Sequence, residues 1–184
     1  MLENRQWYDR GEELKREGDL QGALDAYRQS LKINPRVAAP WVGLADVLET
    51  NQQPLDALEC LKRALAAEPR NVIVATRVAR AFHGLGMLDD ASRAYERALT
   101  IEPGRVNALL GYGQWHEDTG DAAGAAACYR KILEREPGQP DALGAIVGLG
   151  RSIDVSAEID AAKRAMDSGD ARASSGRSFR PASL

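Results

Sequence analysis

One short segment recurs four times along this chain at a constant spacing of 34 residues. It reads ALDAYRQSLKINP at 23–35, ALECLKRALAAEP at 57–69, ASRAYERALTIEP at 91–103 and AAACYRKILEREP at 125–137. A fixed period of this length indicates an array of similar structural units. Each unit of such an array cannot bury its apolar face alone and has to stack on its neighbours. The period therefore constrains the fold more than any single local motif.

Each unit is predicted to contain two helices separated by a turn. In the first unit a helix pattern covers 7–18, and Gly18 interrupts it; Pro54, Gly86 and Gly120 mark the same break later. The recurring segment is the second helix, and its final proline disfavours helical backbone in the residue before it. The pattern predicts an all-α chain of helix–turn–helix units at 4–37, 38–71, 72–105 and 106–139.

Five positions of each unit resemble those of the tetratricopeptide repeat, TPR: a large apolar residue at 4, a small one at 8, alanine at 20, an aromatic residue at 24 and proline at 32. Small residues let the helix backbones approach, and bulky ones fill the space around that contact. The corresponding residues are Trp7, Trp41, Ala75 and Leu109; Gly11, Ala45, Ala79 and Gly113; Ala23, Ala57, Ala91 and Ala125; Tyr27, Leu61, Tyr95 and Tyr129; and Pro35, Pro69, Pro103 and Pro137.

Departures from the TPR pattern are mild. Ser30 and Ile132 stand at position 27, where the pattern has alanine, and His116 stands at position 11, where it has an aromatic or large residue. The resemblance covers residues 4–139. It implies a right-handed α-solenoid of antiparallel helix pairs.

The first helix of the first unit is polar where later first helices are mostly apolar. Positions 3, 10 and 14 are Gln6, Glu13 and Glu17 in the first unit. A face without a preceding unit meets water, so we expect the array to start at residue 4. By the same reasoning Trp115, at position 10 of the fourth unit, is expected to pack between units; the alternative is an exposed aromatic residue that recognises a partner.

Beyond Pro137 the repeat pattern weakens. Residues 140–150 are expected to form a fifth first helix, although three glycines weaken it. Residues 152–170 keep a narrow apolar stripe, which favours a capping helix or a degenerate repeat near a break in a longer protein. We therefore expect a TPR array at 1–167, with 140–167 as a partial unit, and a flexible Ser/Gly/Arg-rich tail at 168–184.

Composition excludes several classes of function. The net charge is −3, which gives no general affinity for nucleic acid or for anionic membranes. The first residues lack the apolar core of a signal peptide, and no stretch approaches the roughly 20 apolar residues of a membrane span. We expect a cytoplasmic protein. Cys60 and Cys128 lie two repeats apart and are interpreted as small apolar residues rather than as a redox pair or metal ligands.

No set of residues suggests catalysis, a metal or a cofactor. His83 and His116 lie on different units without ligands at zinc spacing, and His116 is expected near the core. The segment GAIVGLG at 144–150 lacks the strand and the Lys-Ser/Thr of a phosphate-binding loop. We expect a chain that is not an enzyme.

The resemblance to TPR proteins implies that the first helices line a groove for an extended or helical peptide. Groove positions are 2, 5, 9 and 12, with 6 and 13 beside them. The candidate binding residues are Tyr8, Glu12, Val42, Asp46, Glu49, Ile73, Arg77, Arg80, His83, Leu110, Gln114 and Glu117.

Arg77, Arg80 and His83 would form a basic stripe along one helix. One interpretation is an anchor for an acidic side chain or a peptide carboxylate. The alternative is that the arginines pair with carboxylates of neighbouring units, in the weak manner of surface ion pairs. The residues disfavour the TPR subclass that clamps the C-terminus of chaperones. Four of its five clamp positions hold Tyr8, Glu12, Gly43 and Ile73, and only Arg77 fits the pattern.

Three functions remain open from the sequence. The first is an adaptor or scaffold that binds a protein or peptide partner. The second is the repeat segment of a larger enzyme, as in bacterial TPR-containing sulfotransferases and glycosyltransferases. The third is a scaffold that assembles with itself through its groove or tail. Of these we favour the adaptor, which needs no nucleic acid and no membrane.

Overall fold

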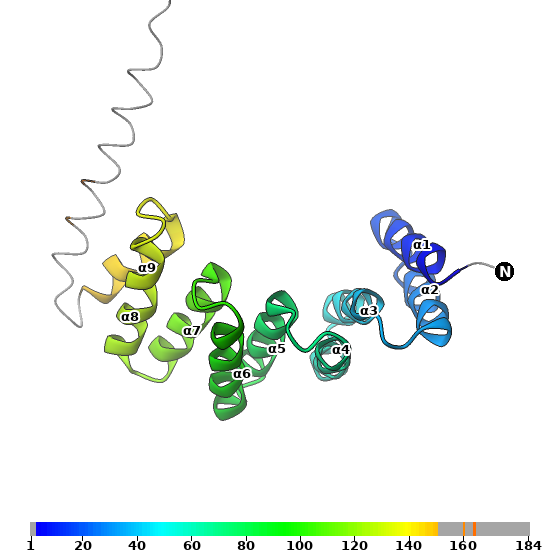
Figure 1. Ribbon diagram of the computed structural model, residues 1–184, viewed down its shortest axis with the longest axis horizontal. Coiled ribbons are helices and arrows are strands. Elements are labelled where there is room, and N and C mark those ends of the chain that lie inside the picture. The colour runs from blue at the N-terminus through cyan, green and yellow to red at the C-terminus, as the bar shows by residue number, and fades with distance from the viewer. Residues whose placement is uncertain (1–2, 151–159, 161–163, 165–184) are drawn as a thin grey trace, which may run out of the picture. The chain divides into compact units, whose positions relative to one another are not determined.

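The computed structural model describes residues 3–150, together with residues 160 and 164. In this part of the chain there are nine α-helices and no strand (Figure 1). The all-α fold class is therefore confirmed. The predicted capping helix, apart from Asp160 and Arg164, and the Ser/Gly/Arg-rich tail lie outside the described residues.

First and second helices alternate along the chain. The first helices begin at position 1 of each unit and the second helices at position 17, so successive starts within each set are 34 residues apart. The first helices are α1 (Asn4–Glu17), α3 (Ala38–Thr50), α5 (Val72–Gly84) and α7 (Val106–Asp118). The second helices are α2 (Leu20–Ile33), α4 (Pro54–Ala67), α6 (Leu88–Ile101) and α8 (Ala122–Leu133), and α9 (Pro140–Leu149) follows as the fifth first helix that the sequence predicts.

The turn between the two helices of a pair uses left-handed backbone at position 15. Gly18, Gly86 and Gly120 have φ of 85°, 73° and 81°. Gln52 holds the same position in the second unit, with φ of 58°. Glycine adopts this conformation at no steric cost, whereas a residue with a Cβ does not. The glycines that the sequence marks as breaks therefore end the first helices for a conformational reason.

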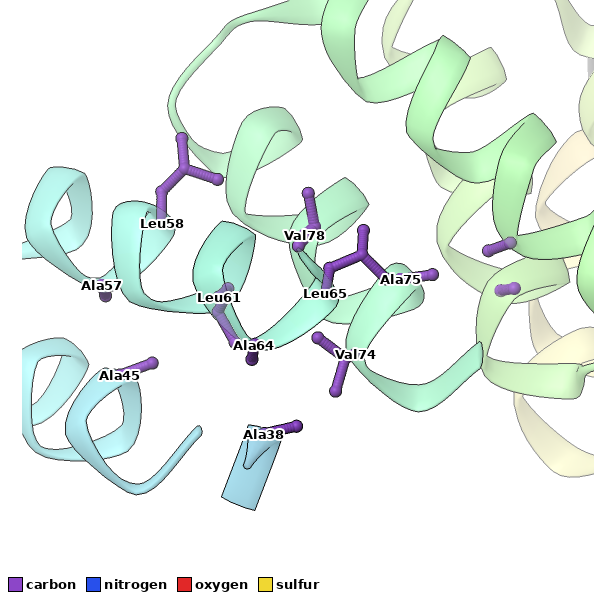
Figure 2. Close-up of a cluster of buried hydrophobic side chains, with 12 residues drawn as sticks. Ala38, Ala45, Ala57, Leu58, Leu61, Ala64, Leu65, Val74, Ala75 and Val78 are labelled. Carbon is purple, nitrogen blue, oxygen red and sulfur yellow. The ribbon is translucent and has the colours of Figure 1, made fainter. Parts of the chain in front are cut away.

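The chain divides into two compact units, Met1–Ala108 and Leu109–Leu184. In the first, α1 packs on α2, α3 on α4 and α5 on α6, while α2–α3 and α4–α5 contacts join successive pairs. Figure 2 shows the core between α3, α4 and α5, where Leu61, Ala64 and Val74 are at most 3% exposed. Alternating large and small side chains thus bury the faces that single helix pairs would leave in water.

Two glycines lie directly against the ring of Tyr27. A Cβ built on Gly11 of α1 would come 2.5 Å from Tyr27 Cε1, and one on Gly43 of α3 would come 2.6 Å from Tyr27 Cζ. No side chain fits at these distances without a shift of the ring. In the second compact unit Gly113 has the same relation to Tyr129, at 2.5 Å. The glycines at position 8 of the first and fourth units, and Gly43 at position 6 of the second, thus leave room for the ring at position 24.

Exposure follows the predicted asymmetry of the first helices. Gln6, Glu13 and Glu17 of α1 are exposed, whereas Pro40, Val47 and Val74 at equivalent positions of α3 and α5 are buried. Position 14 departs from the apolar pattern at Asn51, which is exposed.

In the second compact unit α9 packs on α8. Ala142, Ile146 and Leu149 are buried, while Val147, at position 8 of the fifth unit, is 54% exposed. Over the residues that the structure describes, no helix is long and apolar enough to cross a membrane.

Candidate functional site

The first-helix groove is the face that α1, α3 and α5 present at positions 2, 5, 9 and 12. Tyr8 lies at position 5 of α1, half-buried, with its ring 6.0 Å from that of Tyr27. Val42 is half-buried in α3, and Ile73 is 55% exposed at the start of α5. Of these three predicted groove residues with apolar character, Ile73 is the most accessible.

A chain of ion pairs joins the three first helices across this face. Lys15 Nζ donates to Glu12 Oε1 at 3.0 Å and to Asp46 Oδ2 at 3.1 Å, which links α1 to α3. Arg77 of α5 donates from Nη1 to Asp46 Oδ1 at 2.6 Å and from Nη2 to Glu49 Oε2 at 3.0 Å. Each oxygen of Asp46 therefore has its own cationic donor. We call these five residues the ion ladder.

The ion ladder is half-buried rather than fully exposed. Side-chain exposure is 24% for Arg77, 26% for Lys15 and 34% for Asp46. Burial lowers the pKa of Lys15, but the hydrogen bonds to Glu12 and Asp46 outweigh it, and the pKa lies above its ordinary value. A single exposed pair contributes about 0–1 kcal/mol, and a network with shared partners contributes more. The ladder fixes side chains of three repeats in one arrangement.

The hydroxyl group of the tyrosine at position 24 lies at the first-helix groove. Tyr27 Oη donates to Glu12 Oε1 at 2.6 Å. Burial first, and then this hydrogen bond, raise the pKa of Tyr27. In the third unit Tyr95 meets His83 edge to face, with ring centroids 6.3 Å apart. Sequence reasoning treats position 24 as packing only; the signal it missed is a tyrosine facing a polar residue at position 9 or 12.

The predicted basic stripe on α5 divides into residues with different surroundings. Arg77 pairs with carboxylates of the preceding unit, which is the alternative that the sequence left open. Arg80, one turn further on, is exposed and forms no ion pair with any residue of the described ranges. With Glu49 and Arg77 it lines a shallow pocket of about 260 Å³. Of the two arginines, Arg80 is the one accessible to a partner.

Groove positions of α7 belong to the second compact unit. Leu110 is half-buried, Gln114 is exposed, and Glu117 accepts a hydrogen bond of 2.6 Å from Tyr129 Oη. Burial, followed by the hydrogen bond to Glu117, raises the pKa of Tyr129. The tyrosine at position 24 thus donates to a first-helix carboxylate in both units, at position 9 (Glu12) in the first and at position 12 (Glu117) in the fourth.

His116 has a local structural partner. Its Nδ1 lies 2.9 Å from Asp121 Oδ2, and its ring contacts those of Tyr112 and Trp115 at centroid distances of 4.5 Å and 5.0 Å. Asp121 also caps α8, because its side chain accepts a hydrogen bond from the backbone N of Gly124. This hydrogen bond is the main cause of a lowered pKa of the Asp121 carboxyl, and His116 lowers that pKa further. His116 is half-buried, in agreement with its near-core interpretation.

Cysteines and possible metal ligands are the remaining reactive groups. Cys60 is half-buried and Cys128 is buried, and both are free thiols. Burial raises the pKa of Cys128 to about 11 and also raises that of Cys60. Among the residues with described positions, no three His, Cys, Asp or Glu side chains form a group that would hold a metal.

Three solved structures resemble this chain in fold. A search of curated sequences gives no match. A crystal structure of the MamA protein is 20% identical, with a TM-score of 0.72 over 98% of this chain and 97% of that chain. Pseudomonas aeruginosa pilF is 22% identical, with a TM-score of 0.73 over 89% of this chain and 73% of that one. YrrB, a TPR protein with an unusual peptide-binding site, is 19% identical, with a TM-score of 0.67 over 88% and 84%.

Likeness at such low identity concerns the fold alone. The family match is separate: the tetratricopeptide repeat matches at residues 14–81 and again at 82–147. These ranges make up most of the chain. The chain therefore belongs to the tetratricopeptide repeat family.

Proposed function

We propose that this chain is an adaptor or scaffold whose first-helix groove binds a peptide or helix of a protein partner, without catalysing a reaction. Membership of the TPR family supports a protein-interaction module. The observation that carries the proposal is the ion ladder, because it holds the polar side chains of α1, α3 and α5 in place before any partner arrives. Such preorganisation lowers the entropy cost of binding.

Two accessible side chains on α5 define what the groove would contact. Ile73 is 55% exposed, and Arg80 is exposed without an ion pair among the described residues. They are seven residues apart on one side of the helix, hence about 10 Å apart along its axis. An extended segment spans that distance in about three residues. The expected partner segment therefore carries an apolar side chain and a carboxylate about three residues apart.

A peptide-display selection on the full chain tests this function. The groove variant is Ile73→Ser/Arg80→Glu, which alters two exposed side chains outside the ion ladder. Its matched control is Ile33→Ser/Arg36→Glu, since Ile33 is 51% exposed at the end of α2 and Arg36 is exposed in the turn that follows. We expect enriched peptides to bind the groove variant at least about tenfold more weakly and the control with unchanged affinity.

Equal loss on both double variants would contradict the proposed groove, because the control leaves α5 intact. Retention of full binding to the groove variant by every enriched peptide would contradict it as well. Concentration-dependent light scattering in the same samples separates a self-assembling scaffold from an adaptor, which is expected to scatter as a species of constant mass.

A further inference from the structure

Two crevices between neighbouring second helices occupy the same place in successive repeats. One, of about 570 Å³, lies between α2 and α4 over α3; the other, of about 410 Å³, lies between α4 and α6 over α5. Most residues that line the first crevice have a counterpart 34 residues further along the chain that lines the second. The apolar pairs are Leu31 with Leu65, Leu44 with Val78, and Leu48 with Phe82. We call these two sites the second-helix crevices. They are one feature of the repeat and lie away from the first-helix groove.

The floor of each crevice is apolar and held in place. Trp41 and Leu48 in the first crevice, and Phe82 in the second, pack against the core but are only partly buried. Trp41 Nε1 donates to the carbonyl of Pro35 at 3.0 Å, and the guanidinium of Arg63 lies over its ring at 5.1 Å. Leu65 and Val78, both labelled in Figure 2, line the second crevice and belong to one buried apolar cluster. These contacts preform a surface for an apolar side chain.

Basic side chains surround both floors. The cations are Arg28, Lys32 and Arg63 around the first crevice, and Lys62, Arg93 and Arg97 around the second. Asp90 also lines the second crevice, where it pairs with Arg93 at 2.6 Å. The whole chain has a net charge of −3. The charge of the crevices is therefore opposite in sign to that of the chain, and it complements an acidic partner.

Four of these cations already have carboxylate partners. Arg28 pairs with Asp25 at 3.2 Å, and Arg63 pairs with Glu59 at 3.2 Å, each within its own helix. Lys62 and Arg93 likewise have carboxylates on their own helices. Such exposed pairs within one helix are weak, so a ligand carboxylate competes with them readily.

The other two cations have no carboxylate partner. Lys32 and Arg97 are both exposed and form no ion pair with any residue in the described part of the chain. Arg97 Nη2 donates only a long hydrogen bond, of 3.4 Å, to the carbonyl of Pro69. Each crevice thus offers one cation whose charge is not neutralised by a described carboxylate.

We propose that the second-helix crevices bind acidic peptide segments of a protein partner. A large apolar side chain of the segment enters the crevice, and its flanking carboxylates pair with Lys32 in one crevice and with Arg97 in the other. The apolar floors of the two crevices are repeat equivalents, whereas the two cations are not: Ala66 stands at the position of Lys32, and Arg63 at that of Arg97. A partner with two such segments binds both crevices at once and gains affinity from the linkage. This surface is separate from the first-helix groove and does not depend on it.

The proposal is tested by selecting a display library of random peptides on the groove variant Ile73→Ser/Arg80→Glu. In this variant the first-helix groove is altered, so binding to the crevices is measured separately. We expect enriched peptides that combine Asp or Glu with Trp, Phe or Leu. Reversing the crevice charges in Lys32→Glu/Arg97→Glu should weaken their binding at least about tenfold, with weaker binding in high salt. The same number of charges reversed in Arg10→Glu/Arg16→Glu, at two exposed positions of α1 that line neither crevice, should leave the affinity unchanged.

The reaction rate of a cysteine thiol in each crevice measures directly whether a peptide occupies that crevice. Cys60 lines the first crevice, and its repeat equivalent in the second is Ala94. In a Cys128→Ala background Cys60 is the single thiol, and Cys60→Ala/Ala94→Cys/Cys128→Ala moves that thiol to the second crevice. Saturating amounts of an enriched peptide should slow the reaction of both thiols with a disulfide reagent at least about fivefold.

Three outcomes would overturn the proposal. They are a selection without acidic and apolar enrichment, full binding to Lys32→Glu/Arg97→Glu in variants that melt at the wild-type temperature, and thiol reaction rates that saturating peptide leaves unchanged. None of these outcomes affects the first-helix groove, which its own pair of variants tests.

Discussion

At the scale of single residues, Gln52 is the one left-handed residue of the described chain that is not glycine. Its φ of 58° places a Cβ where Gly18, Gly86 and Gly120 have none. We expect Gln52→Gly to raise the free energy of unfolding by about 1 kcal/mol, because it removes the strain of left-handed backbone. Chemical denaturation measures this change.

The reciprocal substitution is the control. Gly86→Ala places a Cβ at the equivalent position of the third unit, where no atom lies within 4 Å, so only backbone strain acts. It should lower the free energy of unfolding by about 1 kcal/mol. If Gln52→Gly is neutral while Gly86→Ala destabilises, backbone strain does not govern the stability of the second unit's turn.

Gly11 illustrates a steric requirement of a different kind. Gly11→Ala would place a methyl group 2.5 Å from the ring of Tyr27. We expect it to destabilise the fold by about 1–3 kcal/mol, since the ring has to move within a packed core. Gly84→Ala in α5 meets nothing within 4 Å and should be neutral or stabilise by up to about 1 kcal/mol. Equal effects of the two substitutions in thermal denaturation would rule out the steric explanation.

The buried tyrosines predict how stability depends on alkaline pH. Burial raises the pKa of Tyr95 to about 12, and burial followed by hydrogen bonds to carboxylates raises the pKa of Tyr27 and Tyr129. Tyrosine in an unfolded chain ionises near pH 10. The folded state therefore holds these protons more tightly, and the stability they contribute is complete below about pH 10 and is lost as the pH rises further.

Tyr27→Phe isolates the contribution of one hydroxyl. Denaturation at several pH values above about 9 should show that the free energy of unfolding falls more steeply in the wild-type chain than in Tyr27→Phe. Parallel pH profiles would mean that the hydrogen bond to Glu12 does not hold the Tyr27 proton in the folded chain.

At the scale of helices, Asp46 connects three first helices through two cations. We expect Asp46→Asn to lower the free energy of unfolding by about 1–2 kcal/mol, because it removes charge from pairs with both Lys15 and Arg77. The effect should shrink in high salt. Asp25→Asn removes an exposed pair with Arg28 within one helix and should change stability by at most about 0.5 kcal/mol.

Salt titration of the two variants separates a network from isolated pairs. If Asp46→Asn costs no more than Asp25→Asn at low salt, then the ion ladder is not a connection between repeats but a set of independent surface contacts.

At the scale of the whole chain, the repeat spacing predicts the interval between successive helix starts, although the sequence pattern begins the first helix at residue 7 and the structure begins it at Asn4. The starts at Asn4, Ala38, Val72 and Val106 follow from local signals that recur: a small residue at position 20, a break at position 15 and a proline at position 32. These signals act through backbone sterics and close packing, which a short segment encodes. The positions of the helices can therefore be predicted from the sequence.

The candidate sites depend on contacts between units and were harder to predict. The sequence places Arg77 in the groove but leaves open whether it binds a ligand or pairs with Asp46, because that choice depends on distances between neighbouring first helices. The second-helix crevices were missed altogether, since a cavity is what side chains leave unfilled. A comparison of Arg63 and Arg97, one period apart on successive second helices, would have signalled a shared basic surface.

Amide NMR of the isotopically labelled full chain, with a display-selected peptide, shows whether a partner segment binds across α1, α3 and α5. We expect chemical-shift changes concentrated on these three helices, around Ile73 and Arg80, and their disappearance in Ile73→Ser/Arg80→Glu. Shift changes confined to α2, α4 and α6 for every selected peptide, with α1, α3 and α5 unperturbed, would contradict binding in the first-helix groove.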